Sequence, residues 1–115
     1  MAVTFGVNLA NGKILGIANT ILYTAPASII RVAINQARLV NYSVAPATVD
    51  LYILQPSEVA ADEFKAVDTV ILAAGDTKLV SEIIGDSLNA GGTIVGISTT
   101  ATAVSFSATG TEFSA

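Results

Sequence analysis

The sequence predicts an all-β domain: an antiparallel two-sheet sandwich, jelly-roll-like, with about eight strands. Runs of alternating apolar and polar residues recur about every 10 residues, separated by glycine, proline or asparagine. Much of the polar content is serine and threonine, which suit strands. A length of 115 residues suffices for one core but not for two, so residues 1–115 are expected to form one domain.

The first third of the chain predicts at least two strands. Apolar residues alternate from Val3 to Leu9, which is typical of a half-buried strand. Asn11-Gly12 favours a tight hairpin turn, and the stretch from there to Tyr23 fits either two strands or one bent strand. Pro26 then interrupts the pattern, because proline cannot donate to a strand ladder.

A third strand begins at Ile30, and its alternation changes phase within Asn35–Ala37. Buried positions are even before this point and odd at Leu39, and one extra residue in a strand has that effect. We therefore expect a β-bulge near Gln36.

The second half of the chain predicts five further strands around one polar loop. Residues 55–65 hold Pro56 and four charged side chains, which favours an exposed loop or a single helical turn. The predicted strands are Val49–Leu54, Val67–Ala73, Thr77–Ile84, Thr93–Ser98 and Val104–Thr109. Gly75, Gly91, Gly92 and Gly110 are interpreted as turn residues rather than a phosphate cradle, because strands and not helices follow them.

The residue types argue against catalysis and against a bound cofactor. With no histidine and no cysteine, the chain cannot supply a Ser-His-Asp triad, a Cys-His pair or a usual zinc site. We therefore expect no enzymatic activity, no catalytic, cofactor-binding or metal-binding residues, and no cofactor. The missing tryptophan also disfavours a glycosidase, which usually presents aromatic platforms to its sugar.

Two weaker kinds of site are open to test. Calcium needs six to eight oxygen ligands, and two acidic sets could contribute some, although neither has EF-hand spacing. Tyr42 and Tyr52 flank a turn, where they would stack on a sugar or form an aromatic pair across a hairpin. The acidic sets are Asp62, Glu63 and Asp68, and Asp76, Glu82 and Asp86.

Charge is scarce, and its distribution excludes some partners. Charged residues make up 12% of the chain, about half of the roughly 25% that is usual, and 52% of residues are apolar. A small domain of this composition leaves apolar area outside, which favours burial against other subunits. A net charge of −4 and five scattered basic residues argue against nucleic-acid binding.

The uncharged stretches 14–30 and 87–111 contain too many polar residues to span a membrane. We expect them to lie in the core and in subunit contacts, with residues 55–65 facing solvent. The N-terminus lacks the basic and apolar regions of a secretory signal, which favours use without export. We also predict that deleting residues 1–8 impairs assembly.

Six short motifs in this order resemble the small β-sandwich structural proteins of tailed bacteriophages. The resemblance covers roughly residues 20–110. Gly92 departs from it, since aspartate is commoner there, and Asn35–Arg38 is longer. The motifs are Ile21–Ala27, Val40–Ser43, Thr48–Ile53, Leu72–Thr77, Leu88–Thr93 and Val104–Gly110.

The resemblance implies a virion component with no catalytic residues. It implies a capsid decoration or cement protein that forms a homo-oligomer, with a trimer favoured, and binds the major capsid protein or another virion protein. It also implies assembly in the host cytoplasm. The alternatives are a tail, neck or fibre adaptor of the virion, or a carbohydrate-binding module on the same sandwich.

Overall fold

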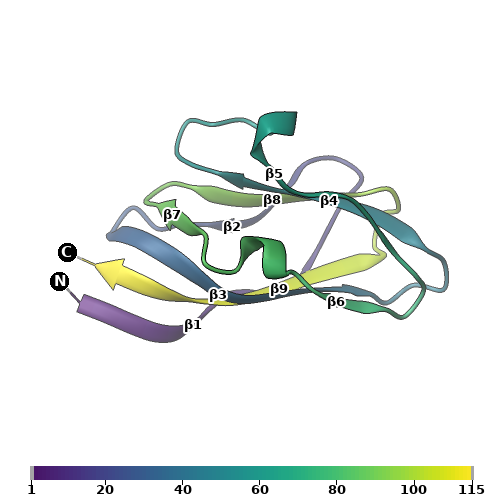
Figure 1. The fold of residues 1–115 in the computed structure, drawn as a ribbon, viewed down its shortest axis with the longest axis horizontal. Helices are drawn as coiled ribbons and strands as arrows, with labels where there is room; N and C mark the ends of the chain where they lie inside the picture. The colour runs from purple at the N-terminus through teal and green to yellow at the C-terminus, as the bar shows by residue number, and fades with distance from the viewer. Residues whose placement is uncertain (1, 115) are drawn as a thin grey trace.

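The computed structural model describes residues 2–114, which form nine strands in two antiparallel sheets (Figure 1). Sheet A has the order β1-β9-β3-β6, with β7 also paired to β3, and sheet B has the order β2-β8-β4-β5. The strands are β1 (Ala2–Ile14), β2 (Thr20–Thr24), β3 (Ile29–Asn41), β4 (Ala47–Leu54), β5 (Lys65–Leu72), β6 (Thr77–Leu79), β7 (Ser87–Asn89), β8 (Thr93–Ser98) and β9 (Val104–Ser114). Two short 3-10 helices are η1 (Asp62–Phe64) and η2 (Ser81–Ile83).

The connections confirm the predicted two-sheet sandwich of jelly-roll type. The chain crosses between the sheets after β1, β2, β3, β5, β7 and β8, so most sequence neighbours lie in different sheets. If the short β7 is set aside, each sheet holds four strands in the interleaved order of two Greek keys. Neither short helix in the described part of the chain is long enough to cross a membrane.

The core lies between the sheets and is aliphatic except for one aromatic ring. β8 and β9 each have a strand on both sides, and Ile94, Val104 and Phe106 on them are fully buried. This confirms that residues 87–111 supply much of the core. Residues 14–30 lie partly in the core and partly on the surface, because Leu15 and Leu22 are buried whereas several isoleucines of this stretch are exposed.

The predicted bulge near Gln36 is confirmed. β3 pairs with β9 in regular register from Arg31 to Ile34, and the register shifts between Ile34 and Gln36. Val32 and Ile34 point into the core before the shift, and Ala37 and Leu39 do so after it. One looped-out residue thus keeps both halves of a long strand facing the same core.

The predicted hairpin at Asn11-Gly12 is wrong, because β1 continues to Ile14 as a single strand. Gly12 has φ 66° and its N–H donates to Ser107 Oγ at 3.0 Å on the neighbouring strand. The positive φ serves a bulge in β1, where the register against β9 shifts between Ala10 and Lys13.

The predicted strand over Thr77–Ile84 is correct only for its first three residues. After β6 the chain forms η2, with Val80 and Ile83 both fully buried. A spacing of three residues between buried positions suits a 3-10 turn. Residues 55–61 form a partly to fully exposed loop that leads into the single turn η1, as predicted, whereas Lys65 already begins β5.

Gly110 is not a turn residue, although Gly75 and Gly91 are. It lies within β9, opposite Ile34 of β3, and a Cβ there would overlap the carbonyl oxygen of Ala33. The same Cβ would lie 2.8 Å from Leu9 Cδ1. The position therefore needs glycine because β3 and the side chain of Leu9 leave no room.

Candidate assembly surface

Two shallow hollows on the described surface are candidate sites, and neither gathers groups for acid–base or nucleophilic chemistry. The first, of about 210 Å³, lies on the outer face of sheet A between the bulges of β1 and β3. Its lining contains no acidic side chain. The second hollow, of about 200 Å³, has one acidic side chain in its lining, Asp50. The polar side chains that line the first are Asn8, Asn11, Gln36, Arg38, Ser107 and Thr109.

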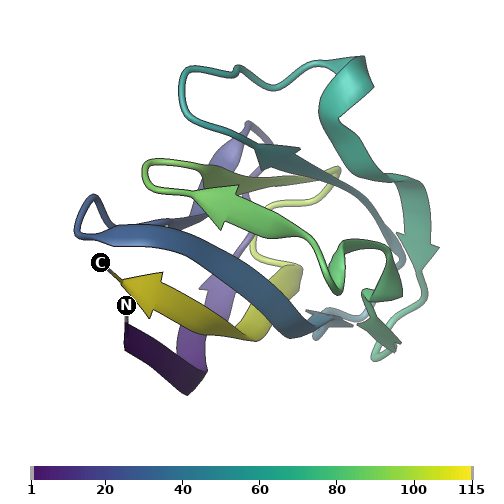
Figure 2. The same cartoon turned by 60° about the vertical axis from the view of Figure 1, so that its left-hand side comes forward.

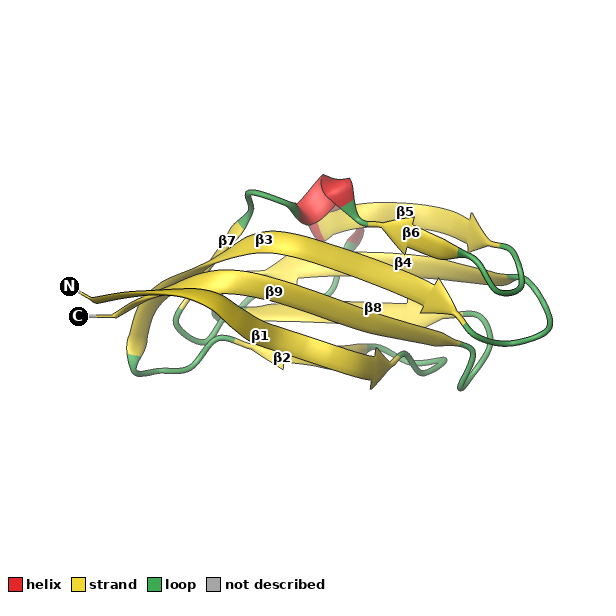
Figure 3. Ribbon diagram, turned by 90° about the horizontal axis from the view of Figure 1, so that it is seen from below, coloured by secondary structure: helices red, strands yellow, loops and turns green. Residues whose placement is uncertain are grey.

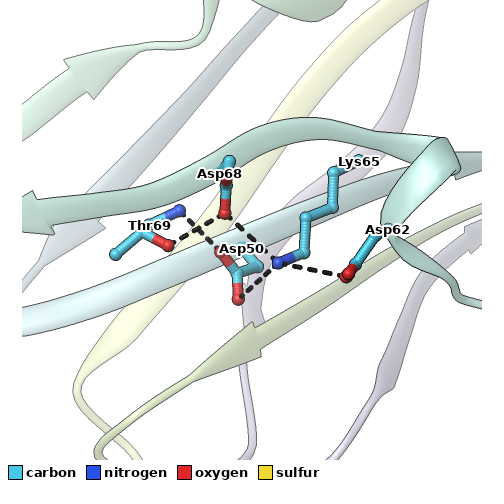
Figure 4. Close-up of polar contacts among 5 residues, drawn as sticks. All are labelled: Asp50, Asp62, Lys65, Asp68 and Thr69. Carbon is cyan, nitrogen blue, oxygen red and sulfur yellow. Dashed lines mark hydrogen bonds and ion pairs between the residues drawn. The ribbon is translucent and has the colours of Figure 1, made fainter.

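Lys65 occupies the centre of the first acidic set (Figure 4). Its Nζ lies 3.2 Å from Asp68 Oδ1, 3.6 Å from Asp62 Oδ1 and 3.8 Å from Asp50 Oδ2. Asp50 joins the cluster from the neighbouring strand β4, whereas Glu63 makes no ion pair in it. The position that a cation would take between these carboxylates is therefore filled by an ammonium group.

Thr69 completes this cluster and lowers the pKa of Asp68. Its Oγ1 donates to Asp68 Oδ1 at 2.9 Å, and this bond, followed by the one from Lys65, holds the pKa of Asp68 below its usual 3.8. The hydrogen bond to Asp68 raises the pKa of Lys65. Both pKa shifts favour the charged pair at neutral pH.

Replacing Asp68 by asparagine is expected to flatten the acid branch of the stability curve. Because the folded-state pKa lies below 3.8, the carboxylate stabilises the fold above that pH and loses this effect as the pH falls through the folded-state pKa. Thermal unfolding between about pH 2 and pH 6 measures the slope. Glu63→Gln, outside the cluster, is the control, and equal slopes for wild type and Asp68→Asn would contradict the assignment.

The second acidic set, Asp76, Glu82 and Asp86, does not form a cluster. Glu82 pairs with Lys78 at 3.3 Å, and burial raises the pKa of the Asp86 carboxyl. Among residues 2–114, no group of three or more His, Cys, Asp or Glu side chains is placed to hold a metal ion.

The two tyrosines do not flank a hairpin. Tyr42 follows β3 in sheet A, and Tyr52 lies on β4 in sheet B, so the turn between them crosses from one sheet to the other. Tyr52 stands directly opposite Lys65 and Val95 on its own sheet. The structure thus gives neither the aromatic pair nor a shared sugar platform.

Tyr23 carries an unpaired buried hydroxyl. Among residues 2–114, its oxygen is shielded from solvent and has no hydrogen-bond partner. Burial, with a smaller effect of the Glu112 carboxylate, raises its pKa to about 12. The ionised form is thus disfavoured in the fold, so stability should fall as the pH rises from 10 towards 12.

Tyr23→Phe is expected to leave the free energy of unfolding unchanged or to raise it by up to about 1 kcal/mol, because it removes a buried donor without a partner. The alkaline loss of stability should shrink as well. Urea denaturation at pH 8 and pH 11 measures both effects, with Tyr42→Phe as the exposed control. A clear loss of stability at pH 8 would show that the hydroxyl has a partner.

Three of the four sheet edges are short or interrupted. β6 and β7 close the far side of β3 together with Asp86, whose carbonyl accepts from Ile34 N–H at 2.8 Å (Figure 2). β2 has five residues and a register shift next to Ile21. β5 has a bulge at Thr69, φ 54°, beside the charged cluster of Lys65. Charge, bulges and short strands are the usual protection of an edge.

The fourth edge, β1, is long and uncharged at its start. Residues 2–12 contain no charged side chain, and Ala2–Thr4 pair with β9 without a register shift. The start of β1 and the end of β9 extend side by side beyond the rest of the sandwich (Figure 3). Both faces of β1 are therefore exposed there: Phe5 is 77% exposed and Val3 40%, so the predicted half-buried strand is wrong at this end.

Apolar side chains also lie on the outer face of sheet B. Ile21, Val95 and Tyr52 stand directly opposite one another across β2, β8 and β4. Ile21 is 61% exposed, and Ile17 in the preceding loop is 65% exposed, whereas Val95 between Ile21 and Tyr52 is buried. The surface thus offers both an open strand edge and an apolar row to other chains.

No protein-family model matches the chain, and no curated protein matches its sequence. Solved structures with a similar fold include the following two. A protein of the disulfide-linked pili that form Bacillus endospore appendages has a TM-score of 0.52 at 12% identity, over 97% of this chain and 88% of that chain. A chain of infectious bursal disease virus, Gx strain, has a TM-score of 0.52 at 16% identity, over 96% of this chain and 31% of that chain.

Proposed function

We propose that this chain is a non-enzymatic structural subunit of a phage virion, a capsid decoration or cement protein that self-associates as a trimer and stabilises the head. The observation that carries the proposal is the unprotected, uncharged start of β1 on a small jelly roll whose other edges are protected. The exposed side chains of Ile17 and Ile21 on sheet B add to it, because apolar surface of this kind marks contacts with other chains.

The fold supports a role in assembly. Jelly rolls build viral capsids and also lectin domains. The similar structures come from pili and from a virus, both of which are built from many protein copies. The 115 residues contain no cysteine, so copies of this chain would associate without disulfides.

Two measurements on the purified chain test the proposal. Light scattering at increasing protein concentration should give a mass above that of one 11.7 kDa chain, with three copies at saturation. Heads of the phage that encodes the chain, stripped of their outer proteins, should carry it down on sedimentation and become more resistant to heat. A chain that is monomeric throughout and stays in the supernatant would overturn the proposal.

The other candidate roles give different results in the same experiments. Sedimentation with tails instead of heads would replace the decoration role by that of an adaptor. Signal on a glycan array, with or without Ca²⁺, would favour the carbohydrate-binding module, for which the polar hollow beside Arg38 offers hydrogen-bonding side chains.

The predicted effect of deleting residues 1–8 becomes more specific with the structure. The deletion would remove the first part of β1, including the exposed Val3 and Phe5, and uncover the end of β9. We expect the oligomer to dissociate in light scattering. An unchanged mass in a folded deletion variant would contradict this prediction.

A further inference from the structure

The start of β1 has backbone hydrogen-bonding groups that pair with no strand in residues 2–114, because β1 is an edge of sheet A. An edge strand directs alternate N–H and C=O groups away from its sheet. In β1 the segment Ala2–Phe5 precedes the first bulge, at Gly6 with φ 66°, and is exposed on both faces. A straight, uncharged segment of this kind is a template for one more strand.

The outer face of this segment is apolar and continues across sheet A. Val3 stands opposite Phe113 of β9, and Phe113 stands opposite Arg31 of β3, so the three share a face. The Arg31 guanidinium lies over the Phe113 ring, 4.1 Å from its centre, in a cation–π contact. Phe5, two residues after Val3, falls on the same face.

We propose that the partner of this edge is the same segment of a second copy, paired antiparallel about Thr4. This inference rests on the proposed self-association and names one contact of the assembly. The pairing is two-fold, so it joins two copies, and a trimer needs a further contact on another surface. Thr4 then faces Thr4 of the second copy, and Val3 of each copy faces Phe5 of the other. Sheet A becomes continuous across the two molecules, with a row of Arg31, Phe113, Val3 and the second copy's Phe5 running through the junction.

The sequence of the segment favours a copy of itself over a different partner. In antiparallel self-pairing the side chains near the centre meet only the same short set, so a single charge there would lie close to its own copy on the second chain. Residues 2–12 contain none. The register about Thr4 also keeps both bulky residues of each copy on one face and forms aromatic–β-branched pairs, which stabilise sheets.

The contact is small, which fits a joint within a larger assembly. Stable dimers bury about 800 Å² on each partner, and a strand pair of about five residues contributes only part of that area. The isolated pair should therefore be weak and concentration-dependent. In an assembly, further contacts such as the Ile21 row raise the effective concentration of the two edges.

Single cysteines test the register directly, because the chain has none of its own. Directly opposite residues in an antiparallel pair have Cα atoms about 4.5–5.5 Å apart, within the range that a disulfide spans. Under mild oxidation with oxidised glutathione, we expect Thr4→Cys to form a covalent dimer about tenfold faster than Thr77→Cys on the opposite edge of sheet A.

Val3→Cys and Phe5→Cys provide the register control. Each alone should cross-link slowly, whereas an equal mixture should form the mixed dimer at a rate close to that of Thr4→Cys. Circular dichroism verifies that each variant is folded. Equal rates for Val3→Cys and Thr4→Cys, or for Thr77→Cys and Thr4→Cys, would overturn the proposed pairing.

The outcomes separate this inference from the proposed function. If the wild-type chain forms oligomers in light scattering but Thr4→Cys does not cross-link, the pairing is wrong and self-association stands on another surface. If the wild-type chain is monomeric at every concentration, both fail.

Discussion

Gly110→Ala is expected to lower the free energy of unfolding by about 3 kcal/mol, the upper part of the range for overpacked cores. The added methyl group would overlap the carbonyl oxygen of Ala33 and press on Leu9 Cδ1, 2.8 Å away. Relief would require β9 and β3 to separate where they form the centre of sheet A. Urea denaturation at one fixed protein concentration measures the change, because self-association would otherwise shift the midpoint.

Gly75→Ala is the matched control for Gly110→Ala. Gly75 has φ 78°, but a Cβ there would meet nothing within 4 Å. Only the strain of a positive φ remains, so the expected loss is about 1 kcal/mol. Equal losses for the two variants would show that the close approach of β3 and β9 at Gly110 is not the dominant cause.

Asn41→Ala is the second substitution with a large expected effect, again about 3 kcal/mol. The side chain is fully buried at the end of β3. Its Nδ2 donates to the carbonyls of Ala45 at 2.9 Å and Leu72 at 3.0 Å, and its Oδ1 accepts from the N–H and the hydroxyl of Ser43. Each buried group left without a partner costs about 1–3 kcal/mol.

Ser43→Ala separates the role of Asn41 from that of its neighbour. It removes the hydroxyl bonds to Asn41 Oδ1 at 2.7 Å and to the backbone of Ala45, but leaves the backbone bond from Ser43 N–H and both Nδ2 bonds. The expected loss is about 1 kcal/mol. Equal losses of unfolding free energy for Ser43→Ala and Asn41→Ala would contradict a role of Asn41 in joining the two sheets.

Asn41 also explains one motif of the resemblance in physical terms. The sequence Asn41-Tyr42-Ser43 stands where the chain leaves sheet A for sheet B. Asn41 Nδ2 reaches Leu72 at the end of β5, and Asn41 N–H donates to the Asp76 carbonyl at 2.9 Å. The motif is therefore a junction between three segments rather than an isolated turn.

Strand positions, the bulge in β3 and the turn glycines could be predicted from the sequence, because they depend on neighbouring residues. Alternation of apolar and polar residues with a period of two predicted the positions of most strands and the two-sheet fold class, since adjacent side chains of a strand point to opposite faces. The bulge at Gln36 was predictable because a change of phase is visible within a few residues. Gly75 and Gly91 were predicted as turn residues because their positive φ is a local requirement.

Close contacts, ion pairs between strands and the burial of individual side chains could not be predicted from the sequence, because they depend on how distant strands are arranged. In the sequence Gly110 looks like a turn glycine, but in the fold Ala33 and Leu9 lie so close to it that no side chain fits. Asp50 joins Lys65 only when β4 and β5 pair, and a positive φ at Gly12 serves a bulge because β9 continues alongside. The same holds for Val3 and Phe5: alternation marks a strand, but whether it is buried depends on how far the opposite sheet extends.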